Sequence, residues 1–494
     1  STLLLKILSL LSMVFFSCTP QADKMFTLMP STVTGIDFRN PLQETEQFNV
    51  LNYGYLYNGG GVAIGDINDD GLSDIYFTGN MVGSRLYLNQ GNFNFKEIAE
   101  QAGVFASGLW NTGTTMADVN GDGFMDIYVC RSAAKDSNKR KNLLFINNGD
   151  LTFTEKGEEY GVDDSGYSTQ GAFFDYDKDG DLDLYVLNHS TQEYAGLGKI
   201  SRHHKKQKNK SYSDKLMRND NGKFVDVSDE AGLISNILGF GLGIAVSDLN
   251  NDSWLDLYIS NDYNEQDYLY LNNGDGTFSE QLEDYIGHVS LYSMGSDIAD
   301  INNDGLTDIM TLDMLPEGNY RIKMTSGPDN FEKLSHLEKN GFYHQTMRNM
   351  LQLNRGGDYF SEIGQFSGVS NTDWSWASLF TDLDNDGFKD LFITNGYRKD
   401  YTNMDFMNYV VQEKINERKT KEKIQLKELI DKMPSTIEEN YTYKNNGDLT
   451  FSKVNKDWGL DQKTLSNGAA YVDLDNDGDM DCLLYTSPSP RDRG

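Results

Sequence analysis

A nine-residue acidic pattern recurs seven times along the chain, and it constrains the fold more than any other feature. In the first copy, DINDDGLSD (66–74), acidic or amide side chains stand at places one, three, five and nine, and glycine stands at place six. The glycine permits a sharp turn that directs these oxygens inward, and the carbonyl of place seven can add another. About 6–8 hard oxygen ligands are typical of Ca²⁺, whereas Mg²⁺ demands a stricter octahedron. Each copy is therefore predicted to be a calcium loop rather than a solvated acidic turn.

The other copies keep the pattern closely. They are DVNGDGFMD (118–126), DYDKDGDLD (175–183), DLNNDSWLD (248–256), DINNDGLTD (300–308), DLDNDGFKD (382–390) and DLDNDGDMD (473–481). Only the fourth copy lacks the glycine, which Ser253 replaces, and we expect its site to be the weakest. The predicted ligands are Asp66, Asn68, Asp70, Leu72, Asp74; Asp118, Asn120, Asp122, Phe124, Asp126; Asp175, Asp177, Asp179, Asp181, Asp183; Asp248, Asn250, Asp252, Trp254, Asp256; Asp300, Asn302, Asp304, Leu306, Asp308; Asp382, Asp384, Asp386, Phe388, Asp390; and Asp473, Asp475, Asp477, Asp479, Asp481.

The loops are not EF-hands. An EF-hand needs a bidentate glutamate at place twelve and a helix on each side. Place twelve of the first copy is Phe77, and the flanking runs GVAIGD and DIYFTGN are short and rich in residues that favour strands. Each loop is therefore predicted to join two β-strands.

A second element accompanies six of the loops. It is an apolar run, an Asn/Gly/Asp turn and an aromatic residue, as in LYLNNGDGTF, which is typical of a β-hairpin. Four antiparallel strands that repeat with a shortest spacing of 52 residues predict the blade of a β-propeller. The predicted fold is all-β, a seven-bladed β-propeller with a small helical insertion.

These units resemble FG-GAP repeats, also called VCBS repeats, which form the calcium blades of integrin α-subunits. The resemblance covers about residues 26–484. The stretches YNGGGVAIGDINDDGLSDIYFTGN and TNGYRKDYTNMDF also resemble bacterial relatives of cartilage acidic protein, which carry an ASPIC/UnbV domain downstream. The resemblance implies up to seven Ca²⁺ ions, but it says little about the ligand.

The N-terminus is typical of a secretory signal, with one lysine before an apolar stretch. Cys18 after Ser17 resembles a bacterial lipobox, with Phe15 in place of the usual leucine. We expect a signal peptide (1–17), a lipid on Cys18 and a polar tether (18–25), and hence an outer-membrane or cell-surface lipoprotein. The alternative is an ordinary cleaved signal on a periplasmic or secreted protein.

The propeller is predicted to span residues 26–484. Residues 26–36 match the pattern of the fourth strand, so the N-terminal strand is expected to complete the last blade, although that blade's third strand has no evident source. Residues 485–494 include a Ser/Pro-rich basic stretch and are predicted to be a non-native tail on a C-terminally truncated reading frame.

Net charge is −32, and 24 of the 75 acidic residues occupy the side-chain places of the loops. Metal binding is therefore expected to supply free energy of folding. A surface this acidic argues against binding to nucleic acid. Cys130 and Cys482 each follow a loop and are expected to be small buried residues without a disulfide.

Aromatic side chains recur eight residues before a loop. Five of them, together with Trp376, form a candidate ligand platform: Trp110, Tyr167, Phe240, Tyr292, Trp374 and Trp376. Packing between blades is the first interpretation, and stacking on sugar rings or on a protein partner is the alternative.

Three insertions leave the repeat plan, at 189–214, 313–348 and 404–433, and the last has helical spacing. The sequence shows no HExxH, GxSxG or CxxC motif, so an enzyme is not favoured. The predicted function is a calcium-binding, monomeric, extracytoplasmic module that binds polysaccharide or protein. The alternatives are a polysaccharide-degrading lyase or hydrolase, and a scaffold for a missing C-terminal domain.

Overall fold

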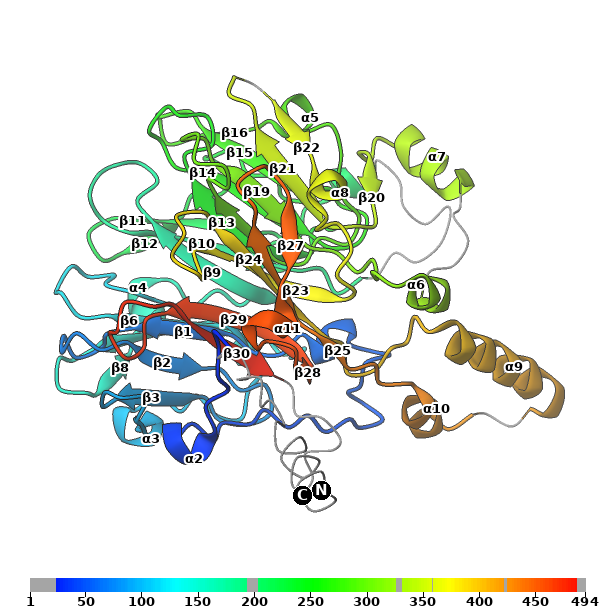
Figure 1. Ribbon diagram of the computed structural model, residues 1–494, viewed down its shortest axis with the longest axis horizontal. Helices are drawn as coiled ribbons and strands as arrows, with labels where there is room; N and C mark the ends of the chain where they lie inside the picture. The colour runs from blue at the N-terminus through cyan, green and yellow to red at the C-terminus, as the bar shows by residue number, and fades with distance from the viewer. Residues whose placement is uncertain (1–23, 193–202, 326–330, 358, 422–423, 487–494) are drawn as a thin grey trace, which may run out of the picture.

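The computed structural model describes residues 24–192, 203–325, 331–357, 359–421 and 424–486. It is an all-β structure of six four-stranded antiparallel sheets and a seventh, two-stranded sheet, in chain order (Figure 1). We number these sheets 1 to 7 and call the strands of each A, B, C and D.

The strands of the first three sheets are β1 (Val62–Gly65), β2 (Asp74–Phe77), β3 (Arg85–Asn89), β4 (Phe95–Glu97); β5 (Asn111–Ala117), β6 (Asp126–Arg131), β7 (Leu143–Asn147), β8 (Phe153–Glu155); and β9 (Ser168–Phe174), β10 (Asp183–Asn188), β11 (Lys215–Asn219), β12 (Phe224–Asp226). Those of the other four are β13 (Gly241–Ser247), β14 (Asp256–Asn261), β15 (Tyr268–Asn272), β16 (Phe278–Glu280); β18 (Ser296–Ala299), β19 (Asp308–Thr311), β21 (Met350–Asn354), β22 (Phe360–Glu362); β23 (Ser375–Thr381), β24 (Asp390–Asn395), β26 (Tyr441–Asn445), β27 (Phe451–Lys453); and β29 (Ser466–Val472), β30 (Asp481–Thr486). Two short pairs lie outside them, β17 (Val289–Ser290) with β20 (Gln345–Thr346) and β25 (Glu438–Glu439) with β28 (Lys463–Thr464).

Each acidic loop joins strand A to strand B, as predicted. In sheet 1 the register pairs Gly65 with Asp74 and Val62 with Phe77, so the loop closes the end of the hairpin. The aspartate at place nine is the first residue of strand B in all seven sheets. The sequence pattern therefore fixes where each hairpin turns.

The A strands of consecutive sheets lie next to one another, and β29 contacts both β23 and β1. Close approach explains the glycines that precede the loops. A Cβ on Gly113 would lie 2.4 Å from the carbonyl oxygen of Thr169, and one on Gly295 would lie 2.1 Å from that of Trp376. Only glycine lets neighbouring A strands come this close.

Hydrophobic cores fill the spaces between neighbouring sheets. One cluster joins Tyr76 of sheet 1 to Val129 of sheet 2, and another joins Leu474 and Tyr485 of sheet 7 to Ile75 of sheet 1. Sheets 1 and 7 therefore share a core although they lie at opposite ends of the chain.

One-turn helices follow strand D in five sheets: α3 (Ala99–Ala102), α4 (Gly157–Tyr160), α5 (Leu282–Tyr285), α8 (Gly364–Ser367) and α11 (Asn455–Trp458). A left-handed glycine ends four of them and lies against the next sheet. A Cβ on Gly103 would lie 3.2 Å from the carbonyl oxygen of Phe153, the first residue of the next strand D.

Residues 26–35 repeat this arrangement between sheets 6 and 1. A Cβ on Gly459 would lie 2.5 Å from the carbonyl oxygen of Phe26, and one on Gly35, after α2 (Ser31–Thr34), would lie 2.5 Å from that of Phe95. The N-terminal segment thus stands where strand D of sheet 7 is expected, although it forms no strand.

Longer helices extend from the sheets on one side of the molecule (Figure 1). They are α6 (Asn319–Thr325) and α7 (Phe331–Lys339) in the second insertion, and α9 (Met404–Thr420) and α10 (Leu426–Lys432) in the third, where helical spacing predicted them. Three short 3-10 helices complete the described structure: η1 (Gly54–Tyr57), η2 (Ser137–Lys139) and η3 (His204–Lys206). None of the helices in the described residues is long and apolar enough to cross a bilayer.

One predicted boundary is wrong. Strand β30 runs to Thr486, and Tyr485 is buried and donates from its hydroxyl to the carbonyl of Thr78 at 3.1 Å. Residues 485 and 486 therefore belong to the sheet and not to the tail. The predicted signal peptide, Cys18 and residues 487–494 lie outside the described residues.

Candidate metal centres

Each acidic loop is folded by hydrogen bonds from its own backbone to its aspartates. In the first loop, Asp66 accepts from the N–H groups of Asp70 (3.2 Å) and Gly71 (2.7 Å). Asp70 accepts from the N–H of Leu72 at 2.9 Å. The loop therefore curls around its own carboxylates, so that several oxygens face the same interior.

The aspartate at place nine connects the loop to two strands. One oxygen of Asp74 accepts from the N–H of Ile67 at 2.9 Å, and the other accepts from the N–H of Asn89 on strand C at 2.7 Å. Equivalent pairs of bonds occur in sheets 2 to 6. A change at place nine would therefore disturb both the loop and the sheet.

Burial raises the pKa of every place-nine aspartate, and the backbone N–H donors, two in sheets 1 to 6 and one in sheet 7, only partly oppose it. The pKa is raised to about 6 in Asp74, Asp126, Asp256, Asp390 and Asp481, and to about 7 in Asp183 and Asp308. Neighbouring loop carboxylates add repulsion in each case, and at Asp390 the ammonium group of Lys444 opposes the repulsion from Asp384. These carboxylates would be stabilised by a nearby cation.

The loop oxygens fit a cation in two respects. In three loops, carboxylate oxygens from places one, three and nine lie within 4.8 Å of one another: Asp175, Asp177, Asp183; Asp382, Asp384, Asp390; and Asp473, Asp475, Asp481. Six loop oxygens are also buried without a hydrogen-bond donor among the described residues. They are Oδ1 of Asn68, Asp175, Asp177, Asp181, Asp384 and Asp475. A buried oxygen without a donor is unfavourable unless something else satisfies it.

The loops with asparagine at place three have a different internal contact. The Asn68 amide donates to Asp70 at 3.0 Å, and Asn120, Asn250 and Asn302 donate in the same way. The amide oxygen of Asn68 receives no hydrogen bond among the described residues, whereas those of Asn120, Asn250 and Asn302 each accept one backbone N–H.

The sixth loop holds a lysine that sequence reasoning missed. Lys444, on strand β26, pairs with Asp384 and lies 2.7 Å from Asp386. These hydrogen bonds raise the pKa of Lys444 and lower that of Asp386. An ammonium group thus competes with any metal in this loop. No sequence signal indicated it, because Lys444 is 58 residues from Asp386.

The comparisons with known proteins can now be stated. No curated protein matches this chain. The family model of the FG-GAP-like repeat matches residues 53–129, 132–186 and 248–311, which include five of the seven acidic loops. The chain contains FG-GAP-like repeats.

Two solved structures are similar to it. An Agrocybe aegerita lectin, whose title describes specific recognition of non-reducing terminal N-acetylglucosamine, has 16% identity and a TM-score of 0.40 over 85% of this chain and 84% of its own. The V. cholerae biofilm matrix protein Bap1 has 12% identity and a TM-score of 0.28 over 60% of this chain and 37% of its own. Both TM-scores are too low to transfer a ligand or a blade count.

The predicted aromatic platform is largely covered by the chain itself. Trp110, Phe240, Trp374 and Trp376 are buried. Trp110 packs edge-on against Phe48 and Tyr53, with ring centroids 5.1 and 5.9 Å away. The segment before the first FG-GAP-like repeat therefore lies over part of this rim.

The remaining platform residues also have partners within the chain. Trp374 stacks on Tyr397 with ring centroids 4.0 Å apart, and the guanidinium of Arg140 lies 4.0 Å from the ring centroid of Tyr167. Tyr292 lies edge-on to Tyr263 at 6.3 Å. These contacts favour the packing interpretation of the aromatic residues over a ligand platform.

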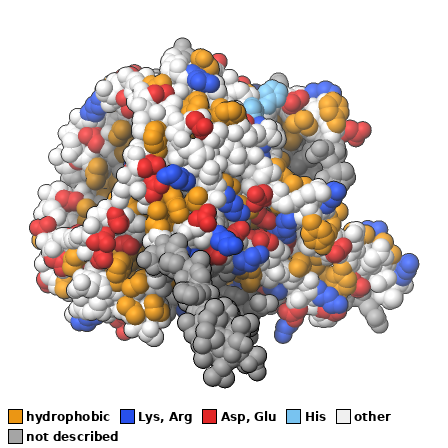
Figure 2. All heavy atoms as spheres, in the orientation of Figure 1, with side chains coloured by type: hydrophobic (Ala, Val, Ile, Leu, Met, Phe, Trp, Pro, Cys, Tyr) orange, Lys and Arg blue, Asp and Glu red, His pale blue; other side chains and the backbone are white. Residues whose placement is uncertain are grey.

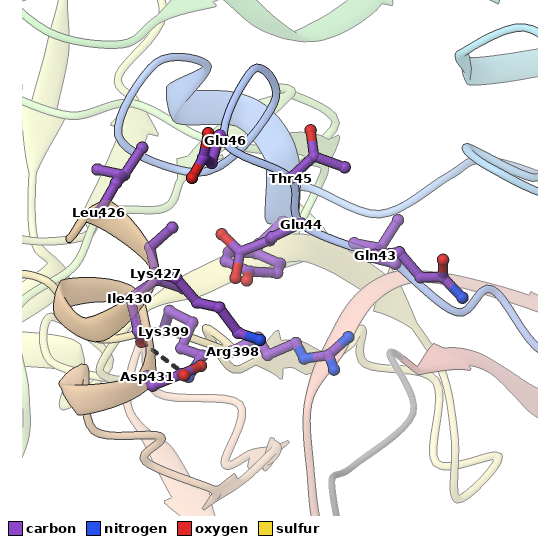
Figure 3. Close-up of a pocket in the computed structure, with 12 residues that line it drawn as sticks. Gln43, Glu44, Thr45, Glu46, Arg398, Lys399, Leu426, Lys427, Ile430 and Asp431 are labelled. Atoms are coloured by element: carbon purple, nitrogen blue, oxygen red, sulfur yellow. Dashed lines mark hydrogen bonds between the residues drawn. The ribbon is translucent and has the colours of Figure 1, made fainter.

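A polar pocket of about 640 Å³ lies between residues 42–46 and helix α10 (Figure 3). Its lining includes the cations Arg398, Lys399 and Lys427 and the ring of Tyr57, whose centroid lies 5.9 Å from the guanidinium carbon of Arg398. Glu44, Glu46 and Asp431 supply the acidic groups of the lining. Within the described residues, none of these acids forms an ion pair with the three cations. Sequence reasoning missed this pocket because its two walls are more than 350 residues apart.

Acidic side chains do not dominate the molecular surface as uniformly as the net charge of −32 indicates. The face in Figure 2 carries basic side chains among the acidic ones, including on the helical side. The third insertion contributes Lys427 to the pocket from this side.

Proposed function

We propose that this chain is a calcium-stabilised, seven-bladed β-propeller that serves as an extracytoplasmic binding module. The observation that carries the metal part of the proposal is the set of six buried loop oxygens that have no donor among the described residues. Other oxygens of the same loops receive backbone N–H groups, as those of Asp66 and Asp175 do. Oxygen ligands in this number and chemistry suit Ca²⁺ better than Mg²⁺.

Contacts around the ring support seven blades. The A strands neighbour one another in order, β29 lies beside β1, and residues 26–35 stand between sheets 6 and 1. Loops of neighbouring sheets also touch, since Asn385 donates to Asp479 at 2.7 Å and Asn476 donates to the carbonyl of Gly71 at 2.9 Å. Acidic loops that meet around one end of a ring would repel one another without cations.

Bound calcium would supply positive charge at each loop. The chain's own residues would then couple the metal-bound loop to the strands of its sheet. Asp74 holds the loop through Ile67 and holds strand C through Asn89, so a correctly placed carboxylate aligns three segments at once. Metal binding and blade folding would be coupled in this way.

For the binding role, the N-terminal sequence supports export and attachment through Cys18. The polar pocket supports a ligand that offers both hydrogen-bond acceptors and donors, such as a polysaccharide or a polar protein segment. Arg398 and Lys427 are the residues that would meet anionic or hydroxyl groups.

Calcium binding is tested by thermal unfolding of the purified chain. We expect a chelator to lower the melting temperature strongly, and Ca²⁺ to restore it at concentrations where Mg²⁺ does not. Elemental analysis of the folded protein should find several calcium ions per chain. A melting temperature that does not respond to the chelator, with no bound calcium, would contradict the proposal.

Ligand binding is tested on a glycan array and with candidate protein partners. We expect Arg398→Ala and Lys427→Ala to weaken binding. Lys463→Ala is the matched control, because Lys463 is an exposed cation outside the pocket that pairs with Glu438 at 3.3 Å. Equal binding by all three variants would exclude the pocket as the ligand site.

A further inference from the structure

Sheet 7 has no strand C among the described residues. Its strand B, β30, pairs only with β29, whereas every other strand B pairs on both sides. The B strands of the other sheets are buried throughout. In β30 only Tyr485 is buried, and Asp481 to Leu484 are half-exposed. The outer edge of β30 is therefore an unpaired strand edge.

The space beyond this edge is bounded on its far side. Phe26 lies where strand D begins, and the hydroxyl of Tyr87 donates to Asp37 at 3.1 Å further along the same segment. Met29 occupies the position of Ile98 in sheet 1, whose N–H donates to the carbonyl of Leu86 on strand C. Met29 is 38% exposed while Ile98 is 5% exposed. Within the part of the chain that the structure describes, no strand therefore lies between β30 and residues 26–29.

Other sheets show what that strand would contact. In sheet 1 the strand-C asparagine, Asn89, donates from its backbone to Asp74 at 2.7 Å and from its side chain to Ser73 (3.0 Å) and Leu474 (2.9 Å). The equivalent acceptors in sheet 7 are Oδ1 of Asp481 and the carbonyls of Met480 and Leu383. Among the described residues, none of these three atoms receives a hydrogen bond from a strand C.

The six existing C strands define a common pattern. They are RLYLN, LLFIN, KLMRN, YLYLN, MLQLN and YTYKN, and every one ends in asparagine. The third residue is Tyr, Phe, Met or Gln, and the second is leucine in five of them. The edge of β30 follows the same kind of acidic loop and lies beside the same kind of sheet as the other B strands. We therefore expect it to bind a strand with the same leucine and asparagine positions.

We propose that the outer edge of β30 is a binding site for one extended peptide strand that another polypeptide segment supplies. The strand would run antiparallel to β30 and carry a five-residue pattern with leucine at the second position and asparagine at the fifth. Its first three residues would pair with Leu484, Leu483 and Cys482, as Arg85, Leu86 and Tyr87 pair with Phe77, Tyr76 and Ile75. Its asparagine would bind Asp481, Met480 and Leu383.

Backbone pairing would supply affinity, and the apolar side chains and the asparagine would supply specificity. The proposal rests on the seven-blade ring proposed above, because the missing strand is identified by comparison with the other blades. It goes further in naming the partner's chemistry.

The test uses the chain as it is, with a synthetic peptide that copies residues 266–275, QDYLYLNNGD, which contain strand β15. Two control peptides carry Tyr270→Pro, which removes a backbone donor on the side that faces strand B, or Asn272→Leu, which removes the amide. Hydrogen exchange of residues 481–486 is measured with and without each peptide. We expect the parent peptide to slow exchange there by about tenfold or more, the proline peptide to have no effect, and the Asn272→Leu peptide to bind more weakly.

Sedimentation and calcium titration in the same samples separate the outcomes. No protection by the parent peptide, or equal protection by the proline peptide, would overturn the strand site. Protection without peptide, together with a dimer, would also overturn it, since β30 would then pair with a second copy. If calcium still raises the melting temperature in these cases, only the strand site fails. If calcium has no effect either, the proposed function fails as well.

Discussion

The side-chain amide of Asn89 on β3 donates to the carbonyl of Leu474 at 2.9 Å, and 385 residues separate the two along the chain. Leu474 is place two of the seventh acidic loop. The same bond joins Asn147 to Ile67, Asn272 to Tyr176, Asn354 to Leu249 and Asn445 to Ile301, each time between neighbouring sheets. The strand-C asparagines of sheets 1, 2, 4, 5 and 6 therefore connect each of these sheets to the loop of a neighbouring sheet.

Asn89→Ala should weaken the contact between sheets 7 and 1. It would leave the buried carbonyls of Leu474 and Ser73 without their donor, at a cost of about 1–3 kcal/mol of unfolding free energy. The matched control is Asn219→Ala, because the Asn219 amide donates only to Leu182 within its own sheet. Chemical denaturation should show a clearly smaller loss for Asn219→Ala. Equal losses would mean that the bond between sheets contributes nothing beyond the bond within the sheet.

Lys444→Leu should strengthen calcium binding at the sixth loop. The ammonium group now pairs with Asp384 and Asp386, and leucine stands at the same strand position in Leu88, Leu271 and Leu353. Removing the competing cation should raise the affinity of this loop by about tenfold. Calorimetric titration after chelation would measure it as a change in one class of sites.

Asp448 provides a check on that result, since it is an exposed acid of the turn after β26 and accepts from Thr450 rather than from Lys444. Asp448→Asn changes the net charge by one unit in the opposite direction to Lys444→Leu and does not touch the loop. A loss of affinity from Asp448→Asn as large as the gain from Lys444→Leu would show a general charge effect.

Ser253→Gly should stabilise the fourth loop. Ser253 has φ 74°, and the six equivalent glycines have φ 84° to 97°, a backbone conformation that glycine adopts at no steric cost. A side chain in this left-handed region costs about 1 kcal/mol. The reverse change, Gly71→Ser, should destabilise the chain by a similar amount, since a Cβ on Gly71 would meet no atom within 4 Å. Denaturation midpoints at saturating calcium would measure both, and shifts of the same sign would contradict the argument.

The repeats could be predicted from the sequence because each loop and each hairpin is a local pattern. The place-nine aspartate marks the start of strand B in every sheet, and helical spacing identified the third insertion. The residues that cover Trp110, Phe48 and Tyr53, could not be predicted, because they precede the first strand and follow no pattern.

Contacts between distant segments of the chain also could not be predicted from the sequence. Glu44 and Arg398 line one pocket, and nothing in either stretch indicates the other. Periodicity identifies which residues face a core, but it does not identify which polar side chains meet when two insertions lie side by side.

The position before strand C carries asparagine in some sheets and a buried aspartate in others. The residue before strand C accepts a hydrogen bond from the end of strand B: Asn142 accepts from Arg131 at 2.8 Å, and Asp214 accepts from Asn188 at 2.8 Å. Asparagine occupies this position in three sheets, whereas sheets 3 and 4 have Asp214 and Asp267. Burial raises the pKa of both aspartates to about 7.

Stability should therefore fall as the pH rises from about 4 to 7 through these two groups. A folded-state pKa above the unfolded value means that the folded chain holds the proton more tightly, so the favourable contribution is complete below the unfolded pKa and is lost above the folded one. Asp214→Asn should remove its share and raise the unfolding free energy at pH 8 by about 2 kcal/mol relative to the parent chain. The new amide can donate to Tyr185, as Asn142 donates to Tyr128 at 2.9 Å.

The unfolding free energies of the parent chain and of Asp214→Asn are compared at pH 5 and pH 8, at saturating calcium. Because the acidic loops are the same in both chains, the difference reports on Asp214. Asn142→Asp is the mirror variant, and it should introduce the same dependence on pH into sheet 2. A variant Asp214→Asn that is equally destabilised at both pH values would show that the carboxylate is ionised and needed in the folded chain. That outcome would contradict the raised pKa.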